Sequence, residues 1–332
     1  MKKISWSAYT KPMILVLFMV ILTVLRPASF LTVGNLSNVL WSVSVYGIMV
    51  CGTIFVFLIG GIDLSIGSLC GLCAVIAVRI IRSFDYTNTG VILGIMAALL
   101  TGIMAGLVHG VIITKFRVPA FLITFATQII FLGLSMILTG NKILSCLQPE
   151  LFTAIGMKKI LRFPIPIYLM LLIALISWFI LGKTVLGRYV YAVGGNSPAA
   201  RLSGIQDRKI TVLAYVFSGF TTAVGGIVLA SMTQQCMAST GSGYETEVIT
   251  AAVIGGVSLL GGEGTVSGAL FGAVLMGLLN NGLNLLSIPS TEHGLVKGIV
   301  ILVAVGLDAL ENKEKFQNWL GQFRWKKEKT EG

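Results

Sequence analysis

The fold is decided by stretches such as VILGIMAALLTGIMAGLVHGVIIT, residues 91–114, in which His109 is the only side chain that can carry a charge. A helix needs about 20 consecutive, mostly apolar residues to cross the hydrocarbon core of a bilayer. The stretch therefore predicts a transmembrane helix, and runs of the same kind recur on both sides of it.

Working outward from this stretch, we predict an all-α integral membrane protein, a polytopic bundle of about ten transmembrane helices, some of them broken or re-entrant. Because the apolar runs are continuous and do not alternate in polarity, they argue against a transmembrane barrel. The first and eighth runs are short for a full crossing, so we expect either to be tilted, broken or extended. The ten runs are roughly Ile14 to Leu25, Val39 to Ile59, Leu64 to Ile81, Val91 to Thr114, Ala120 to Leu138, Ile165 to Leu181, Ile210 to Met232, Val248 to Leu260, Val266 to Leu286 and Leu295 to Leu310.

Composition and charge agree with a membrane protein. The chain of 332 residues is 55% hydrophobic and 11% charged, which leaves too little polar surface for a water-soluble domain of this size. Its net charge of +11 is spread over loops without interleaved aromatic residues, so we expect no nucleic-acid partner. With both termini in the cytoplasm, the cytoplasmic segments hold sixteen Lys and Arg and the outer segments seven, as the positive-inside rule asks.

This orientation gives three predicted parts. Residues 1–12 form a cytoplasmic N-terminal arm, residues 13–310 form the transmembrane domain, and residues 311–332 form a charged cytoplasmic tail. Residues 183–209 are the longest predicted cytoplasmic loop between spans. The outer loop at residues 140–163 carries four basic residues and is the least consistent part of the orientation.

The sequence offers little for catalysis. The tripeptide Gly182-Lys183-Thr184 resembles the end of a phosphate-binding loop, but Ser177 stands where that motif requires Gly. The two histidines, His109 and His293, have no nearby carboxylate or nucleophile at a catalytic spacing. We therefore predict a protein that is not an enzyme, with no cofactor and no metal, and we expect His109 to make an interhelical hydrogen bond.

Glycines at four-residue spacing predict close helix packing. Such rows allow a neighbouring backbone to approach, because glycine has no side chain to hold it away. The rows are Gly67 and Gly71; Gly102, Gly106 and Gly110; and Gly264, Gly268 and Gly272.

Two glycine-rich segments with carboxylates stand out between the apolar runs. They are GGIDLSIGS, residues 60–68, which contains Asp63 and Ser65, and GGVSLLGGEGTVSG, residues 255–268, which contains Glu263. Irregular backbone at membrane depth is tolerated inside protein or along a cavity, so we expect broken helices at both segments. We also expect Asp63 to cap the N–H groups of residues 64–66.

A third polar feature is LLNNGLNLL, residues 278–286, with Asn280, Asn281 and Asn284. These side chains either hold helices together or line a path with neutral donors and acceptors suited to hydroxyl groups. The sequence leaves both interpretations open.

The loop at residues 183–209 predicts a helix of about two turns. Ser197 is a good N-cap, Pro198 fits the first helical position, and Gly204 can close the C-terminus. A short helix capped at both ends is typical of a docking element, although a helix lying on the membrane surface fits the same residues.

Taken together, GGIDLSIGS, LGRYVYAVGGNSPAARLSGI and GSGYETEVITAAVIGGVSLLGGEGTVSGALFGAVLMGLLNNGLNLL resemble the signature segments of permease subunits of bacterial ribose-type ATP-binding cassette importers. The resemblance runs from about Asn35 to Asp308. It implies a multi-pass protein of the bacterial cytoplasmic (inner) membrane, a second identical or related permease, a cytoplasmic ATPase on another chain, and an extracytoplasmic binding protein that delivers a monosaccharide.

The same resemblance implies roles for particular residues. A coupling helix that contacts the ATPase would include Gly194, Gly195, Asn196, Pro198, Ala199, Ala200, Arg201, Leu202 and Gly204. The translocation path would pass near Asp63, Ser65, Glu263, Asn280, Asn281 and Asn284.

Three other functions fit parts of the sequence. An ion-coupled secondary carrier would use Asp63, His109 or Lys297 at mid-membrane. Permeases for autoinducers or nucleosides share much of the pattern, and an integral membrane enzyme is disfavoured because no catalytic cluster is present.

Overall fold

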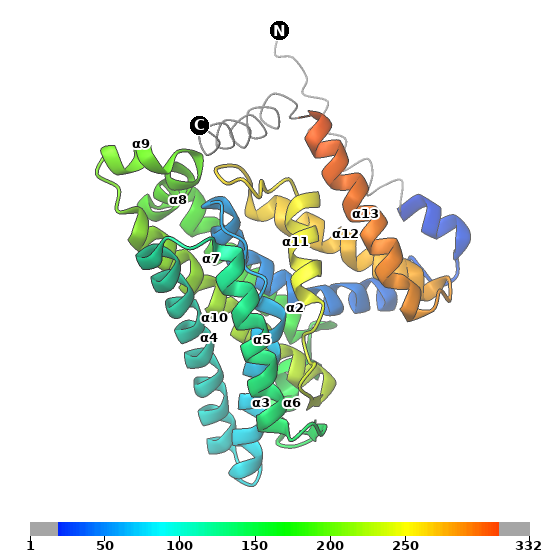
Figure 1. The fold of residues 1–332 in the computed structure, drawn as a ribbon. Helices are drawn as coiled ribbons and strands as arrows, with labels where there is room; N and C mark the ends of the chain where they lie inside the picture. Colours follow the sequence, from blue (N-terminus) through cyan, green and yellow to red (C-terminus); the bar gives the residue numbers. More distant parts are fainter. Residues whose placement is uncertain (1–18, 312–332) are drawn as a thin grey trace.

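The computed structural model describes residues 19–311, with the backbone alone at residues 301 and 303–311. Within that range the protein is almost entirely helical (Figure 1). A helical turn at residues 19–25 is followed by α2 (Val33–Leu58), α3 (Ile66–Ser83), α4 (Asn88–Phe116), α5 (Ala120–Thr139), β1 (Leu144–Ser145), α6 (Glu150–Met157), β2 (Lys159–Ile160), β3 (Phe163–Pro164), α7 (Ile165–Lys183), α8 (Val185–Gly195), α9 (Ser197–Leu202), α10 (Asp207–Thr233), β4 (Gln235–Cys236), α11 (Tyr244–Ile254), α12 (Val266–Leu285) and α13 (Ser290–Glu311).

Seven helices in this part of the chain are long and apolar enough to cross a membrane. They are α2, α3, α4, α5, α7, α10 and α12, and each contains or overlaps one predicted run. The all-α membrane class is therefore confirmed, but the count of about ten spans is not.

The three remaining runs have different outcomes. Residues 14–18 of the first run lie outside the described residues, and the tenth run falls inside α13. The eighth, Val248 to Leu260, is broken, which agrees with its short length and with the break expected at residues 255–268, because α11 has 11 residues and ends at Ile254. A helix of that length rises about 16 Å, roughly half of the hydrocarbon core. Gly256, Gly261 and Gly262 follow it with positive φ, a backbone conformation that ends a helix.

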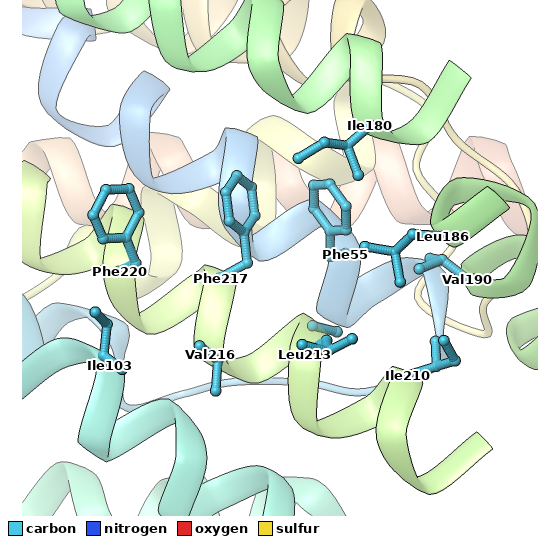
Figure 2. Close-up of a pocket in the computed structure, with 11 residues that line it drawn as sticks. Phe55, Ile103, Ile180, Leu186, Val190, Ile210, Leu213, Val216, Phe217 and Phe220 are labelled. Carbon is cyan, nitrogen blue, oxygen red and sulfur yellow. The ribbon is translucent and has the colours of Figure 1, made fainter. Parts of the chain in front are cut away.

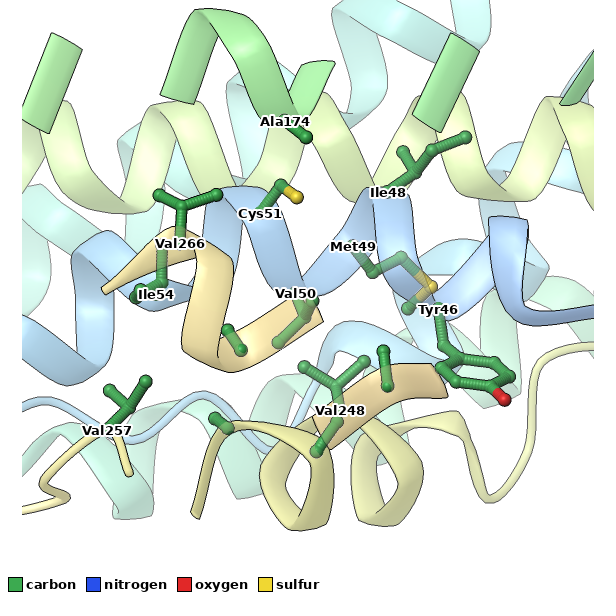
Figure 3. Close-up of a cluster of buried hydrophobic side chains, with 14 of the residues drawn as sticks. Tyr46, Ile48, Met49, Val50, Cys51, Ile54, Ala174, Val248, Val257 and Val266 are labelled. Atoms are coloured by element: carbon green, nitrogen blue, oxygen red, sulfur yellow. The ribbon is translucent and has the colours of Figure 1, made fainter. Parts of the chain in front are cut away.

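The core of the bundle is built around α2. Every residue of this helix from position 43 to position 58 is buried, as expected for a helix that is apolar on all sides. Figure 3 shows side chains of this segment, among them Ile48, Val50 and Ile54, surrounded by residues of α7, α11 and α12. On another side α2 packs against α10, which makes its most extensive contacts with α4.

Five of the predicted row glycines, Gly102, Gly106, Gly110, Gly268 and Gly272, lie at helix crossings or helix ends, whereas Gly67 and Gly71 pack mainly on the loop before α11 and Gly264 on Val257. A methyl group on Gly102 or Gly106 would overlap the backbone of α10 at Gly219 or Tyr215. In the same way, Gly272 of α12 lies against the backbone of α11 at Ala251. These glycines let the helix backbones touch, so the packing role inferred from their spacing is confirmed.

The two ends of α4 and α10 carry different elements. At one end α4 finishes and α10 begins, beside α8 and α9; α6 and the short strands lie at the opposite end (Figure 1). We call the first the α9 end. There Arg117 and Arg201 border the same hollow, so two loops that the sequence assigns to one side of the membrane do share one end.

The strands at the opposite end bring two cysteines near each other. Antiparallel pairing aligns Leu144 with Cys236, and the N–H of Cys146 donates to the carbonyl of Gln234 over 2.8 Å. Both thiols are fully buried. Burial raises the pKa of Cys146 to about 11 and that of Cys236 to about 12, because the thiolate loses its hydration.

Candidate functional site: the α9 end and the polar interior

The loop between α7 and α10 folds into two helices that meet at a sharp bend. Thr184 caps α8 by accepting the N–H of Gly187, and Asn196 stands between α8 and α9. Asn196 Oδ1 accepts the N–H of Ala199 over 3.0 Å, which makes it the N-cap of α9. The predicted cap, Ser197, is instead the first helical residue, because the neighbouring Asn fills the same role one position earlier. Gly204 follows the helix with a φ of +83°, as a closing glycine does.

One side of α9 is turned away from the protein. Pro198, Ala199 and Leu202 are exposed, and Leu202 has 91% of its surface accessible, while Ala200 is buried against the chain. We call Pro198, Ala199 and Leu202 the outer face of α9. It is small and apolar, with one protruding leucine, which is the kind of surface that a partner protein covers.

Arg201 is engaged within the chain. Its Nε donates to Asp207 Oδ2 over 2.6 Å, and a second guanidinium nitrogen lies 2.5 Å from the same oxygen. Ser197 Oγ also donates to Asp207 Oδ2, over 3.3 Å. The pair therefore fastens α9 to the first turn of α10. Sequence reasoning placed Arg201 in the helix that contacts the ATPase and did not predict this internal partner.

Behind the bend, four glycines from three parts of the chain meet at the end of α2. Gly194 of α8 lies directly on the carbonyl oxygen of Leu58, where even a methyl group would overlap it. That same oxygen accepts the N–H of Gly262 over 2.8 Å, and Gly261 packs on Gly60. We call Gly60, Gly194, Gly261 and Gly262 the glycine junction. It joins α8 to both of the segments that the sequence predicts to be broken.

A side-chain bond strengthens this connection. The hydroxyl of Tyr191, on α8, donates to the carbonyl of Gly264 over 2.8 Å. Burial raises the pKa of Tyr191, which keeps its hydroxyl protonated and able to donate. This bond ties α8 to the segment that separates α11 from α12.

Asp63 lies in the break between α2 and α3 and is almost completely buried. Its Oδ1 accepts the backbone N–H of Ser65 over 2.9 Å and the Ser65 hydroxyl over 2.6 Å. This confirms that the carboxylate caps the start of α3, through Ser65. In the neighbouring packing, His109 of α4 bonds Thr127 of α5 over 2.8 Å, which confirms the interhelical hydrogen bond predicted for His109.

A second buried polar group lies where α2, α11, α12 and α13 meet. Lys297 of α13 forms an ion pair with Glu247 of α11, whose same Oε1 accepts from Asn280 Nδ2 over 3.3 Å. Tyr46 of α2 stacks near Tyr244 of α11, with 6.2 Å between ring centroids. We call Tyr46, Glu247, Asn280 and Lys297 the polar centre.

The polar centre has unused hydrogen-bonding capacity. Tyr46 Oη, Glu247 Oε2 and Asn280 Oδ1 are buried and have no hydrogen-bond partner among the described residues. A buried polar group without a partner costs free energy, on the order of 1–3 kcal/mol. Water or a polar solute in the bundle would remove that cost.

The other predicted path residues are not gathered at one place. Asn281 exchanges two hydrogen bonds with Asn35 at the start of α2, of 2.8 and 3.0 Å. Asn284 is exposed, and Glu263 is exposed in the loop beside the glycine junction. The polar strip of α12 is therefore divided among different neighbours.

Sequence reasoning missed the central part of the polar centre. Glu247 and Tyr46 were not singled out, and Lys297 was considered only for ion coupling. The available signal was a carboxylate within the short apolar helix YETEVITAAVI and a lysine within a separate apolar run. Because opposite charges inside a membrane domain are expected to pair, those two residues indicate a contact across 50 positions.

Comparisons with known proteins identify the family of the chain. Residues 35–305 match the family model described as branched-chain amino acid transport system / permease component. The chain is 39% identical to the ribose import permease protein RbsC of Haemophilus influenzae, over 89% of this chain and 90% of the relative. It is 40% identical to RbsC of Bacillus subtilis over 89% and 90%. It is 33% identical to the L-arabinose ABC transporter permease protein AraH of Azospirillum brasilense over 93% and 91%. No solved structure shows a significant match to the chain.

Proposed function

Because the chain belongs to the permease family described as branched-chain amino acid transport system / permease component, we propose that it is the permease subunit of an ATP-binding cassette importer for a monosaccharide. The relatives that share about nine-tenths of its length are named ribose import permease and L-arabinose permease. This likeness to sugar permeases supports a pentose or a similar simple sugar as the cargo. It does not favour an ion-coupled carrier.

The observation that carries the proposal is the link between an exposed docking face and the helix breaks. The outer face of α9 offers Leu202 and Ala199 to a partner, and the helix behind it contacts the glycine junction. Packed elements shift as bodies and do not deform continuously. When the ATPase closes on ATP, it displaces α9, and α8 carries the displacement to the breaks that follow α2 and α11.

The route of the sugar runs beside the polar interior. Tyr46 and Asn280 supply neutral hydrogen-bonding groups there, of the kind that sugar hydroxyls bind. Asp63 and Ser65 hold the start of α3 at the neighbouring break, and Glu263, Asn281 and Asn284 border the same helices. Selection of the sugar rests mainly with an extracytoplasmic binding protein, so the route itself needs only undemanding polar contacts.

The topology we propose extends the seven long helices. The predicted run at residues 14–25 and α13 add crossings, and α11 enters the membrane without spanning it, which brings the bundle close to ten segments. Both termini face the cytoplasm of a bacterial inner membrane, as the distribution of Lys and Arg asks. Residues 1–12 and 311–332 flank a permease domain of residues 13–310, whose coupling loop is residues 183–209.

The assembly we propose contains two permeases, identical or related, each bound to a cytoplasmic ATPase through the outer face of α9. A binding protein delivers the sugar from the other side. This division of labour places ATP hydrolysis on the partner chain.

The test is co-purification of an ATPase with the tagged chain from its own cells in mild detergent. The wild-type chain is expected to bring an ATP-binding cassette ATPase with it. Ala199→Trp adds a large side chain to the outer face of α9 and is expected to abolish co-purification while membrane insertion stays normal. The matched control is Ala126→Trp, at an exposed position of α5 away from the outer face of α9. An ATPase bound equally to the wild-type chain and to Ala199→Trp would refute the docking role of α9.

A further inference from the structure

Three hollows follow one another along α10 at the α9 end. The first is an apolar cavity of about 250 Å³ between α2, α4, α7, α8 and α10. Figure 2 shows Phe217 and Phe220 of α10 along it, with Ile180 of α7, Phe55 of α2 and Leu186 of α8 on the facing walls. All of its lining side chains are apolar or aromatic, so it suits hydrocarbon.

The second hollow lies beside the first and is lined by the aliphatic parts of two basic side chains and by two apolar residues. It has a volume of about 300 Å³ and is lined by Arg208, Lys209, Val212 and Leu213. Leu213 borders both hollows, so they are neighbours along the helix. Arg208 and Lys209 are exposed, so their charges are available to a ligand at the membrane boundary.

The third hollow adds a further cation. It measures about 390 Å³, shares Arg208 with the second, and includes Arg117 from the connection between α4 and α5. Its acidic residue, Asp207, is already paired with Arg201. Arg117, Arg208 and Lys209 therefore border the two hollows that follow the apolar cavity along α10, and the neighbouring carboxylate is compensated.

We propose that this groove binds one anionic phospholipid of the leaflet at the α9 end. The phosphate lies between Arg208, Lys209 and Arg117, and one acyl chain passes Leu213 into the apolar cavity. A lipid fits both parts of the groove at once, because its headgroup is anionic and its chain is apolar. A free phosphate would leave the cavity empty, and an acidic peptide would have to place polar backbone against hydrocarbon.

The lipid would touch the coupling elements directly. Leu186 and Val190 of α8 line the same cavity as Leu213 and Phe217 of α10. An acyl chain in the cavity therefore fills the space between α8 and α10 and supports the position of α8. This inference concerns binding by the chain itself and does not depend on the cargo.

The experiment is native mass spectrometry of the full chain, delipidated in detergent and titrated with phosphatidylglycerol or with phosphatidylcholine of the same acyl chains. The wild-type chain is expected to retain one phosphatidylglycerol more tightly than phosphatidylcholine. Each cation near a membrane surface contributes about a fivefold gain in affinity for anionic lipid. The double variant Arg208→Gln/Lys209→Gln is therefore expected to weaken phosphatidylglycerol binding about thirtyfold.

Two controls separate the groove from general effects. Lys158→Gln/Lys159→Gln removes two adjacent exposed cations at the opposite end of the molecule and is expected to leave the affinity for phosphatidylglycerol unchanged. Val216→Trp fills the cavity and is expected to lower the affinity of the chain for both lipids. Leu175→Trp, at an exposed position of α7 outside the cavity, is expected to leave both affinities unchanged.

Equal binding of the two lipids by the wild-type chain would overturn the proposal, whatever the variants do. Full displacement of the lipid by glycerol phosphate would show an anion site without a chain groove, which also contradicts it. If Arg208→Gln/Lys209→Gln loses the ATPase but keeps phosphatidylglycerol, these cations dock the partner protein and the lipid assignment is wrong.

Discussion

Replacing Leu202 with Ser tests the docking role of α9 most selectively. The side chain is 91% exposed, so its removal takes almost no buried apolar surface from the permease itself. The free energy of unfolding of the isolated chain is therefore expected to stay within about 0.5 kcal/mol of the wild-type value.

The effect on the partner should be much larger. Complete burial of a leucine side chain in a complex contributes about 1.5–3 kcal/mol, and each 1.4 kcal/mol changes a dissociation constant about tenfold. If the ATPase covers Leu202, then Leu202→Ser weakens its binding about ten- to hundredfold. Titration of the detergent-solubilised permease with its purified ATPase measures this change directly.

A matched control lies at the other end of the molecule. Leu161, in the turn between β2 and β3, is 84% exposed, and Leu161→Ser removes the same atoms from a similarly exposed site. It is expected to leave the affinity for the ATPase unchanged. Equal affinities for the wild-type chain, Leu202→Ser and Leu161→Ser would show that the outer face of α9 is not the docking surface.

Three further variants or labels test other parts of the structure. Asp63→Asn keeps an oxygen that accepts both hydrogen bonds from Ser65 and should transport nearly normally. Asp63→Leu leaves those two donors unpaired, which costs about 1–3 kcal/mol per group, and should lower the yield of folded protein. Loss of uptake by an intact Asp63→Asn protein would instead indicate a role for the charge. Lys297→Met leaves the carboxylate of Glu247 without its cation and should lower the free energy of unfolding by about 3–5 kcal/mol, as measured by thermal unfolding in detergent. Adding Glu247→Gln to this variant should restore most of the lost stability. A Lys297→Met protein as stable as the wild type would show that the two residues do not form a buried ion pair. Because the pKa of Cys146 is raised to about 11, its reactive thiolate is scarce at pH 8. Peptide mapping after iodoacetamide treatment should therefore find Cys146 unmodified in the folded protein until the pH approaches 11, whereas the unfolded chain should react near pH 8.5. Rapid labelling of the folded protein at pH 8 would show that this thiol is not buried.

The helices could be predicted because their signals are local. A run such as residues 91–114 fixes its own conformation, and its row of glycines marks the face that meets α10. The end of α11 was harder, since the residues after Ile254 remain apolar and only the conformation of the following glycines stops the helix.

The site was predicted in part, and the failures share one cause. Asn196 and Ser197 are adjacent and equally good caps, so local sequence could not choose between them. Arg201 finds Asp207 only because the chain folds back between α9 and α10. Such contacts depend on how separate elements are placed, which residue patterns within one segment do not encode.

The polar strip of α12 shows the same limit. Asn280 and Asn284 lie one turn apart on α12, yet Asn280 bonds Glu247 while Asn284 is exposed. The neighbouring helices cover only part of the face that these two residues share. The distinction between a path lining and a packing contact therefore required the positions of α11 and α13.

The most direct test of the central claim is uptake of labelled ribose and L-arabinose into proteoliposomes. These contain the chain and its ATPase, with the sugar-binding protein outside and ATP inside. The account predicts uptake of at least one sugar that needs all three proteins and ATP, and that continues when proton and sodium gradients are collapsed. Uptake by the chain alone, driven by an ion gradient and unaffected by removal of the ATPase, would contradict it.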